Sequence, residues 1–414
     1  MTHSRNYRTL RHLILPALAG SALAALAFAP TFGAEPVQAN VPAQSISAPR
    51  VDVPKADVPR PDDVKTGEIN EPAPHKEANP STFTGTAVII ESKTFEHQRF
   101  DNTISDQNSF IGKNKATITI DSSVFDKTGN TSNDDNSNFR GQNAVALGIE
   151  GSQTSIKNSN ITSSSIGSNA VFATDEGSII NVENTNIHTK GDSSRGLDAT
   201  YKGTVNGKNL TITTEGAHSA TLATDRGEGT ITAEAAKLIT SGEGSPVIYS
   251  TGNIMVNNVN GIANNSEIGV VEGKNSITLT NSNVTGYKDN GFMLYQSFSG
   301  DAESGIARLK AAADSRWGKT GENGGHLTLR ASNQELRGNI MADSISTIAL
   351  DMTNGSSLVG AVNTDNTAKE VTVKLSKDSS WTLTGDSYVE SLTNEDTTGE
   401  NIHLNGYKLV VADK

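Results

Sequence analysis

Short runs in which apolar and polar residues alternate recur along most of the chain after about residue 82. Alternation with period two places every second side chain on the same face, so each run predicts a short, half-buried β-strand. Gly, Asn, Asp and Ser separate the runs and predict turns. Clear examples occupy residues 116–120, 210–213, 277–280 and 371–375.

The strands belong to an internal repeat of 22–26 residues. The sequence NSNI at 158–161 returns as NTNI at 184–187. A second repeated motif opens at Ser168, Ser194, Ser219 and Ser245. Several short strands per repeat and no helical period predict an all-β fold, a single-stranded right-handed parallel β-helix in which one repeat is one coil. Matching Asn and Thr side chains are expected to form ladders along the stack.

Two other all-β architectures fit the repeat length less well. An array of sandwich domains would repeat at roughly 90–100 residues. The blades of a β-propeller would repeat at about 40–50 residues. The shorter interval in this chain favours the solenoid.

The N-terminus has the layout of a secretory signal peptide. Arg5, Arg8 and Arg11 precede an apolar run at 13–29, and a small-x-small sequence ends at Ala39. We therefore predict a signal peptide at 1–39 and a protein that is secreted or displayed at the cell surface. The alternative of a retained membrane anchor is disfavoured because the apolar run is short for a bilayer span.

Proline marks the next boundary. Nine of the 12 prolines lie between Glu35 and Ser81. Residues 40–80 also lack hydrophobic periodicity, so they predict a disordered, Pro-rich linker. The β-helix is expected to occupy residues 81–414, because continuous strand ladders exclude proline.

Composition and charge remove several classes of function. The chain has no cysteine, which excludes disulfides, zinc thiolates and a cysteine nucleophile. A formal charge of −12 disfavours nucleic acid and anionic membranes as partners, so we expect neither nucleic-acid binding nor membrane insertion of the mature domain. The eight histidines are scattered, and no cofactor or metal is predicted.

One C-terminal stretch carries a family resemblance. Residues 379–392 (SSWTLTGDSYVESL) and 402–410 (IHLNGYKLV) are similar to the segment before the folding cap of pertactin-like passengers. With the signal peptide and the cysteine-free repeats, the chain resembles the passenger of a bacterial autotransporter. The resemblance implies a β-helical adhesin at the outer membrane or in the medium, with a role in virulence.

The chain departs from that family at its end. Autotransporters carry a C-terminal translocator barrel, and the sequence stops at Lys414, directly after the capping-like segment. The resemblance therefore implies either a passenger separated from its barrel or a secreted β-helix with another exit route. The last strand, expected at 407–412, would then leave an open edge.

Charged residues in the turns are candidates for catalytic groups, because some β-helices are polysaccharide lyases or hydrolases. Such enzymes need three or more charged side chains that converge in one groove. The candidate positions are Asp134, Asp135, Asp175, Glu176, Asp225, Arg226, Asp301 and Glu303. We interpret them as turn residues and predict no catalytic residue. The tripeptide at 190–192 (KGD) is likewise interpreted as a turn.

The repeat is interrupted once, where Ser276 and His326 stand 50 residues apart. This spacing predicts an insert at 286–325, rich in aromatic residues and helix-like at 303–317. Aromatic rings with nearby cations suit contacts with a protein or a glycan, although they could also pack the insert onto the stem. The predicted partner-binding residues are Tyr287, Phe292, Tyr295, Phe298, Arg316 and Trp317. A second loop, at 127–140, is expected to be a mobile turn.

Together these features predict an exported, non-enzymatic β-helix of the adhesin type, which binds a cell-surface protein or glycan through the stem and its insert. The alternatives are a carbohydrate-active β-helix enzyme and a self-associating structural element.

Overall fold

A computed structural model describes residues 7–9, 78–272, 274–287, 290–295 and 324–412. Residues 40–77 of the predicted linker and almost all of the predicted signal peptide lie outside these residues. So do Phe298, Asp301, Glu303, Arg316 and Trp317.

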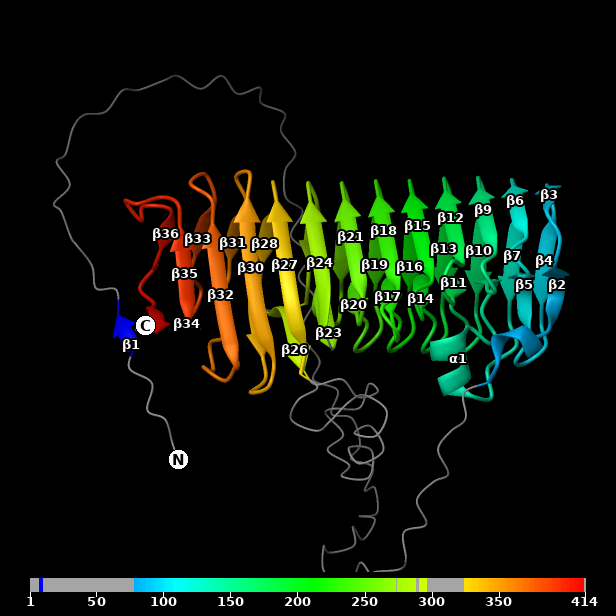
Figure 1. The fold of residues 1–414 in the computed structure, drawn as a ribbon, viewed down its shortest axis with the longest axis horizontal. Coiled ribbons are helices and arrows are strands. Elements are labelled where there is room, and N and C mark those ends of the chain that lie inside the picture. The colour runs from blue at the N-terminus through cyan, green and yellow to red at the C-terminus, as the bar shows by residue number, and fades with distance from the viewer. Residues whose placement is uncertain (1–6, 10–77, 273, 288–289, 296–323, 413–414) are drawn as a thin grey trace, which may run out of the picture. The chain divides into compact units, whose positions relative to one another are not determined.

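The described chain is a right-handed β-solenoid of about 12 turns, as predicted. Most coils add one strand to each of three parallel sheets, named here sheets I, II and III, and the coils follow one another along the chain (Figure 1). Sheet I ends before the last coils, which contribute instead to a separate three-stranded sheet. Sheet I contains β2 (Gly85–Ile89), β5 (Asn108–Gly112), β8 (Ala146–Gly148), β11 (Val171–Thr174), β14 (Leu197–Thr200), β17 (Leu222–Thr224), β20 (Ile248–Ser250), β23 (Gly269–Glu272), β26 (Asn290–Tyr295) and β29 (Asn339–Ala342).

The other two sheets have 12 strands each. Sheet II contains β3 (Lys93–Glu96), β6 (Thr117–Asp121), β9 (Gln153–Lys157), β12 (Ile179–Glu183), β15 (Thr204–Lys208), β18 (Thr230–Glu234), β21 (Asn253–Asn257), β24 (Lys274–Thr280), β27 (His326–Ser332), β30 (Thr347–Thr353), β32 (Glu370–Leu375) and β35 (Ser391–Asn394). Sheet III contains β4 (Arg99–Asn102), β7 (Val124–Lys127), β10 (Asn160–Ser163), β13 (Asn186–Thr189), β16 (Thr211–Thr214), β19 (Lys237–Thr240), β22 (Asn260–Ala263), β25 (Asn283–Thr285), β28 (Glu335–Arg337), β31 (Ser357–Val359), β33 (Ser380–Thr382) and β36 (Ile402–His403).

The register follows the sequence repeat. Ile161 of β10 pairs with Ile187 of β13, so the NSNI and NTNI motifs lie one above the other. The four example runs of alternating residues fall in β6, β16, β24 and β32. Like residues therefore stack on like residues, as the repeat predicts.

The core is a column of inward-facing side chains. In sheet II, Ile180, Val205, Ile231, Ile254 and Ile277 occupy matching positions of successive coils and are fully buried. Burying each such side chain contributes about 1.5–3 kcal/mol, so the column accounts for much of the stability.

Large aromatic rings fill the core near the two ends. Phe100 and Phe125 stack with 4.8 Å between ring centroids at the N-terminal end. Trp381 is fully buried near the C-terminal end, and its Nε1 donates a hydrogen bond to the Gly360 carbonyl at 2.9 Å. The tryptophan of the family-like motif is thus a core residue of the last coils.

Two polar ladders confirm the expectation of stacked side chains. The Ser194 hydroxyl accepts the backbone N–H of Ser168, and the Ser219 hydroxyl accepts that of Ser194, both at 2.9 Å. Between sheets II and III, Asn184 Nδ2 donates to Asn158 Oδ1 at 3.2 Å, and Asn209 Nδ2 donates to Asn184 Oδ1 at 2.7 Å. All three asparagines have a left-handed φ near 50°. Asparagine tolerates this conformation better than most residues, which explains its recurrence at this turn.

The loop predicted as a mobile turn contains a helix instead. In α1 (Asp134–Arg140), the Asn133 side chain caps the N-terminus by accepting the N–H of Asn136 at 2.9 Å. Gly141 ends the helix at a φ of 76°, which glycine adopts without strain. No described helix is long and apolar enough to cross a membrane.

The last strand is not an open edge in this structure. β37 (Leu409–Ala412) pairs in parallel with β34 (Ser387–Val389) and antiparallel with β1 (Tyr7–Thr9). The expected open edge concerns the mature chain and stays a prediction, because β1 belongs to the predicted signal peptide. The predicted cleavage after Ala39 would remove β1 and expose this edge.

Candidate functional site

The predicted partner-binding residues do not form one surface among the described residues. Phe292 lies in β26 of sheet I and is buried in the core, which corrects its assignment to an exposed contact. Its position as an inward residue of a coil strand explains the burial. Tyr287 follows β25 and is 46% exposed. Tyr295 is the last residue of β26 and pairs with Glu272. The coil therefore extends into the predicted insert.

The described acidic candidates are divided between the surface and one buried cluster. Asp175 lies 3.7 Å from the guanidinium of Arg140, and Glu176 lies 3.4 Å from Lys202. Asp225 instead joins Arg195 and Asp198, two residues that sequence reasoning did not single out. The Arg195 Nε and Nη2 atoms reach the two Asp225 oxygens at 3.0 and 3.2 Å, a two-pronged ion pair.

Burial sets the electrostatics of this cluster. Burial, and then the neighbouring Asp225 carboxylate, raise the pKa of Asp198 well above its usual range. Burial alone would lower the pKa of Arg195, but the adjacent Asp225 and Asp198 outweigh it and raise the pKa. Burial and the neighbouring carboxylate therefore both favour the protonated form of Asp198.

Helix α1 lies over the buried cluster. Arg195 Nη1 donates to the Asn138 side chain, and Thr200 Oγ1 donates to the Phe139 carbonyl at 3.0 Å. The guanidinium of Arg226 stacks on the Phe139 ring at 3.7 Å. These contacts hold the helix against sheet I. Arg195, Asp198 and Asp225 therefore support the helix and do not line an open groove. No group of residues suited to a metal ion occurs among the described residues.

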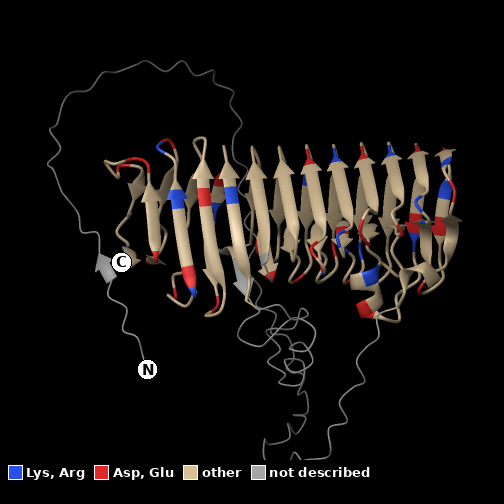
Figure 2. Cartoon of the chain, in the orientation of Figure 1, with Lys and Arg blue, Asp and Glu red and all other residues tan. Residues whose placement is uncertain are grey.

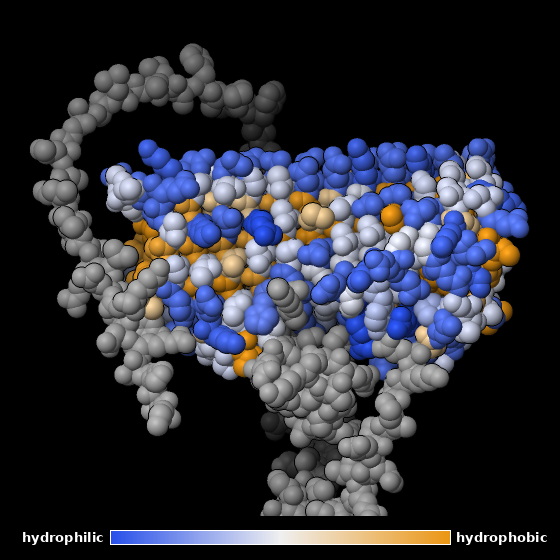
Figure 3. Space-filling view, viewed as in Figure 1, coloured by the Kyte–Doolittle hydropathy of each residue, from blue (hydrophilic) through white to orange (hydrophobic). Residues whose placement is uncertain are grey.

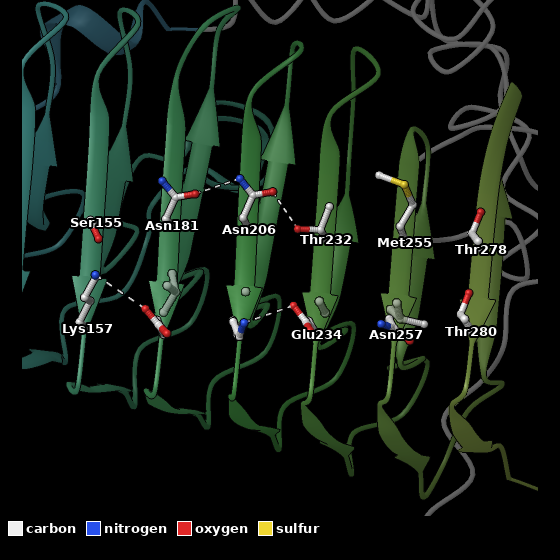
Figure 4. A pocket seen from close by; sticks show the side chains of 16 residues that line it. Ser155, Lys157, Asn181, Asn206, Thr232, Glu234, Met255, Asn257, Thr278 and Thr280 are labelled. Carbon is white, nitrogen blue, oxygen red and sulfur yellow. Dashed lines mark hydrogen bonds and ion pairs between the residues drawn. The ribbon is translucent and has the colours of Figure 1, made fainter.

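An open groove of about 780 Å³ runs along the outer face of sheet II, across β9, β12, β15, β18, β21 and β24 (Figure 4). Two rows of side chains flank it. The first, the amide row, is formed by Ser155, Asn181, Asn206 and Thr232. The second, the charge row, begins one strand earlier, at β6, and is formed by Asp121, Lys157, Glu183, Lys208 and Glu234. We call the space between them the axial groove.

Hydrogen bonds between coils orient the amide row. Asn206 Nδ2 donates to Asn181 Oδ1 at 3.0 Å, and Thr232 Oγ1 donates to Asn206 Oδ1 at 2.8 Å (Figure 4). Between the rows, Gly207 and Ala233 occupy inward-facing positions, so the floor of the groove is formed mainly by the strand backbone. The groove therefore presents regularly spaced polar groups, about 4.8 Å apart, along the solenoid axis.

The charge row alternates in sign from coil to coil. Lys157 lies 3.7 Å from Glu183, and Lys208 lies 3.7 Å from Glu234. Figure 2 shows the alternation at the ends of β6 to β18, and Figure 3 shows that this edge is hydrophilic along its length. The hydrogen bond from Asn158, and then that from Ser122, lower the pKa of Asp121, so the row keeps its negative end at neutral pH.

The sequence predicted Asn and Thr ladders in general, and the amide row is one of them. It did not predict the charge row, although a signal for that row was present. Lys157, Glu183, Lys208 and Glu234 follow one another at the repeat interval, and each ends an alternating run. Aligning the runs by their turns would have placed these four residues in one line. No family model, no curated protein and no solved structure matches the chain.

Proposed function

We propose that this protein is an exported, non-enzymatic β-solenoid of the autotransporter-passenger type, which binds a cell-surface protein or glycan. The N-terminal basic and apolar segments favour export, and residues 379–392 favour the passenger resemblance. The axial groove is the proposed binding site.

The amide row is the observation that carries this proposal. Its side chains are held in place by inter-coil hydrogen bonds before any partner arrives, so little side-chain entropy is lost on binding. Amide and hydroxyl groups repeated at about 4.8 Å suit an extended partner whose own polar groups recur, such as a glycan chain or an extended peptide.

The environment of the acidic candidates favours binding over catalysis. Arg195, Asp198 and Asp225 converge, but they are buried, and α1 lies over them. A carbohydrate-active enzyme would need such groups in contact with its substrate. The groove itself contains paired charges and amides, which are groups that position a ligand.

A pair of matched variants tests the proposed site. Asn181→Ala with Asn206→Ala removes the amide contact in the groove. Asn160→Ala with Asn186→Ala removes an equivalent exposed amide pair, 3.3 Å apart, on sheet III. Binding to whole cells and to arrayed glycans should fall about tenfold or more for the first variant and less than about twofold for the second. Equal binding by the two variants would remove the groove from the proposal.

A further inference from the structure

We propose that the outer face of sheet II also docks a second copy of this chain, with the two solenoids antiparallel. The contact would centre between β12 and β15. This inference does not rest on the proposed function, because it uses the charge row and not the amide row.

The face is regular over six coils. The strands β6, β9, β12, β15, β18 and β21 each have five residues and pair without a register shift. Asp121, Lys157, Glu183, Lys208 and Glu234 are the only charged residues at the outward positions of these strands. All other outward positions have Thr, Ser, Asn, Gln, Ile or Met, so the single row decides the electrostatics of the face.

The order of charges along that row is negative, positive, negative, positive, negative. A parallel pair of solenoids with the two charge rows face to face and in register would place each charge opposite itself, which repels. A two-fold axis parallel to the strands, midway between β12 and β15, instead makes the two solenoids antiparallel. The charge row of the second copy then lies over that of the first and runs in the opposite direction. Glu183 then faces Lys208 of the second copy, and Lys157 faces Glu234, so all four of these charges meet the opposite sign.

The same axis is compatible with the other rows. It places Asn181 opposite Asn206 and Ser155 opposite Thr232, and it brings no second charge into the contact. Within one chain, the ion pairs join Lys157 to Glu183 and Lys208 to Glu234. The second copy would connect these separate pairs into one network, and a network of charges contributes more than isolated surface pairs do.

The area of the face predicts weak association. Six strands about 4.8 Å apart and five residues of about 3.3 Å cover roughly 500 Å² per copy, or about 1,000 Å² in total. Stable dimers usually bury about 1,200–2,000 Å². Single molecules should therefore pair only at high concentration, whereas many copies on one surface would pair strongly through multivalency.

Charge reversal tests the pairing. The double variant K157E/K208E makes the whole row acidic, and E183K/E234K makes its last four positions basic. Sedimentation of the full chain over a concentration series at low salt should show association for the unmodified protein, weakened by salt. Each double variant alone should associate about tenfold or more weakly, and an equimolar mixture of the two should recover it.

The control K190E/K237E makes the same change in net charge away from sheet II and should associate like the unmodified protein. Circular dichroism establishes that each variant is folded. If K157E/K208E does not fold, K157Q/K208Q takes its place, since it removes the two positive charges without adding negative ones. A protein that stays monomeric at the highest concentration, or charge-reversed variants that associate normally, would overturn the proposal.

Cross-linking tests the antiparallel direction, since the native chain has no cysteine. In the proposed pair, residue 157 faces residue 234 of the second copy, and the two copies of residue 157 lie three coils apart. A short bifunctional thiol reagent should therefore join K157C to E234C in a mixture but should not join K157C to itself. Cross-linking of K157C alone would overturn the antiparallel arrangement.

Discussion

Charged residues of the same kinds lie beside sheet I and on the outer face of sheet II, with opposite consequences. Next to sheet I, Arg195 precedes β14 and Asp225 follows β17, and their side chains are only 10% and 4% exposed beneath α1. On sheet II, Lys208 and Glu234 are 58% and 54% exposed. The difference in burial turns the first pair into a structural element and leaves the second free to meet a partner.

The contribution of a charged side chain on a solenoid therefore depends on whether another element covers it and excludes water. Water screens the exposed pairs, so their contribution to stability is small. The buried cluster has lost its water, and each of its members depends on the others. The predictions below test this contrast, from the largest expected effect to the smallest.

Removal of the buried cation should have the largest effect. Arg195→Met leaves the Asp225 carboxylate buried without its counter-charge, and we expect the free energy of unfolding to fall by about 3–5 kcal/mol. Urea denaturation followed by circular dichroism measures the loss. A variant as stable as the unmodified protein would contradict the structural role of the cluster.

The raised pKa of Asp198 should make stability depend on pH. The folded-state pKa of Asp198 lies above its usual value of 3.8, so the native chain retains a proton that the unfolded chain releases. The contribution of this group to stability therefore falls as the pH rises from about 3.8 through the folded-state pKa.

The variant Asp198→Asn cannot ionise at this position and should lack this pH-dependent contribution to stability. Its free energy of unfolding, relative to that of the unmodified protein, should increase as the pH is raised from about 4 to 8. A difference that stays constant across this range would show that Asp198 is ionised in the folded chain.

The asparagine ladder between sheets II and III should show a smaller effect. Asn184→Ala places alanine in the left-handed region and should cost about 1 kcal/mol. The ladder already contains one such residue, Ala235, at a φ of 54°. Ala235→Gly should therefore stabilise the chain by up to about 1 kcal/mol, measured as a higher unfolding midpoint, because relief of the left-handed alanine outweighs the entropic cost of glycine. A lower midpoint would contradict this explanation.

The exposed charge row should show the smallest effect on stability. Lys208→Met removes one member of an exposed pair and should change the free energy of unfolding by about 0–1 kcal/mol, less still at high salt. The same denaturation experiment compares it directly with Arg195→Met. A loss as large as that of Arg195→Met would remove the contrast between the two faces.

The sequence predicted the solenoid well because its signals are local or repeat at a constant interval. The alternating runs at 116–120 and 371–375 became β6 and β32, and the NSNI and NTNI motifs paired as Ile161 with Ile187. Period-two patterns and repeat lengths can be read without knowledge of any distant contact.

Helix α1 could not be read in the same way. The segment DDNSNFR contains no strong helix former except its final arginine. The helix is stabilised by the Asn133 cap and by contacts of Asn138 and Phe139 with residues about 60 positions away. Tertiary contacts here outweigh local propensity.

The charge row could have been identified from the sequence, whereas the buried charged cluster could not. Lys157, Glu183, Lys208 and Glu234 recur at the repeat interval, so an alignment of coils would find them. Arg195, Asp198 and Asp225 occur once each at unrelated positions of their coils. Phe292 lies within the predicted insert, next to the interruption of the repeat, so the sequence placed it at the surface. The register of β26 with β23 shows instead that it belongs to a coil and faces the core.

By itself, the sequence determined that this chain coils, how long each coil is, and which side chains stack inside it. Each of these properties depends on the order of apolar, polar and turn-forming residues within a few positions. Only the tertiary structure decided which charges lose their water, because burial depends on α1 lying over sheet I. It also decided that five charged side chains of successive coils form one alternating line, because strand register sets their position across the sheet.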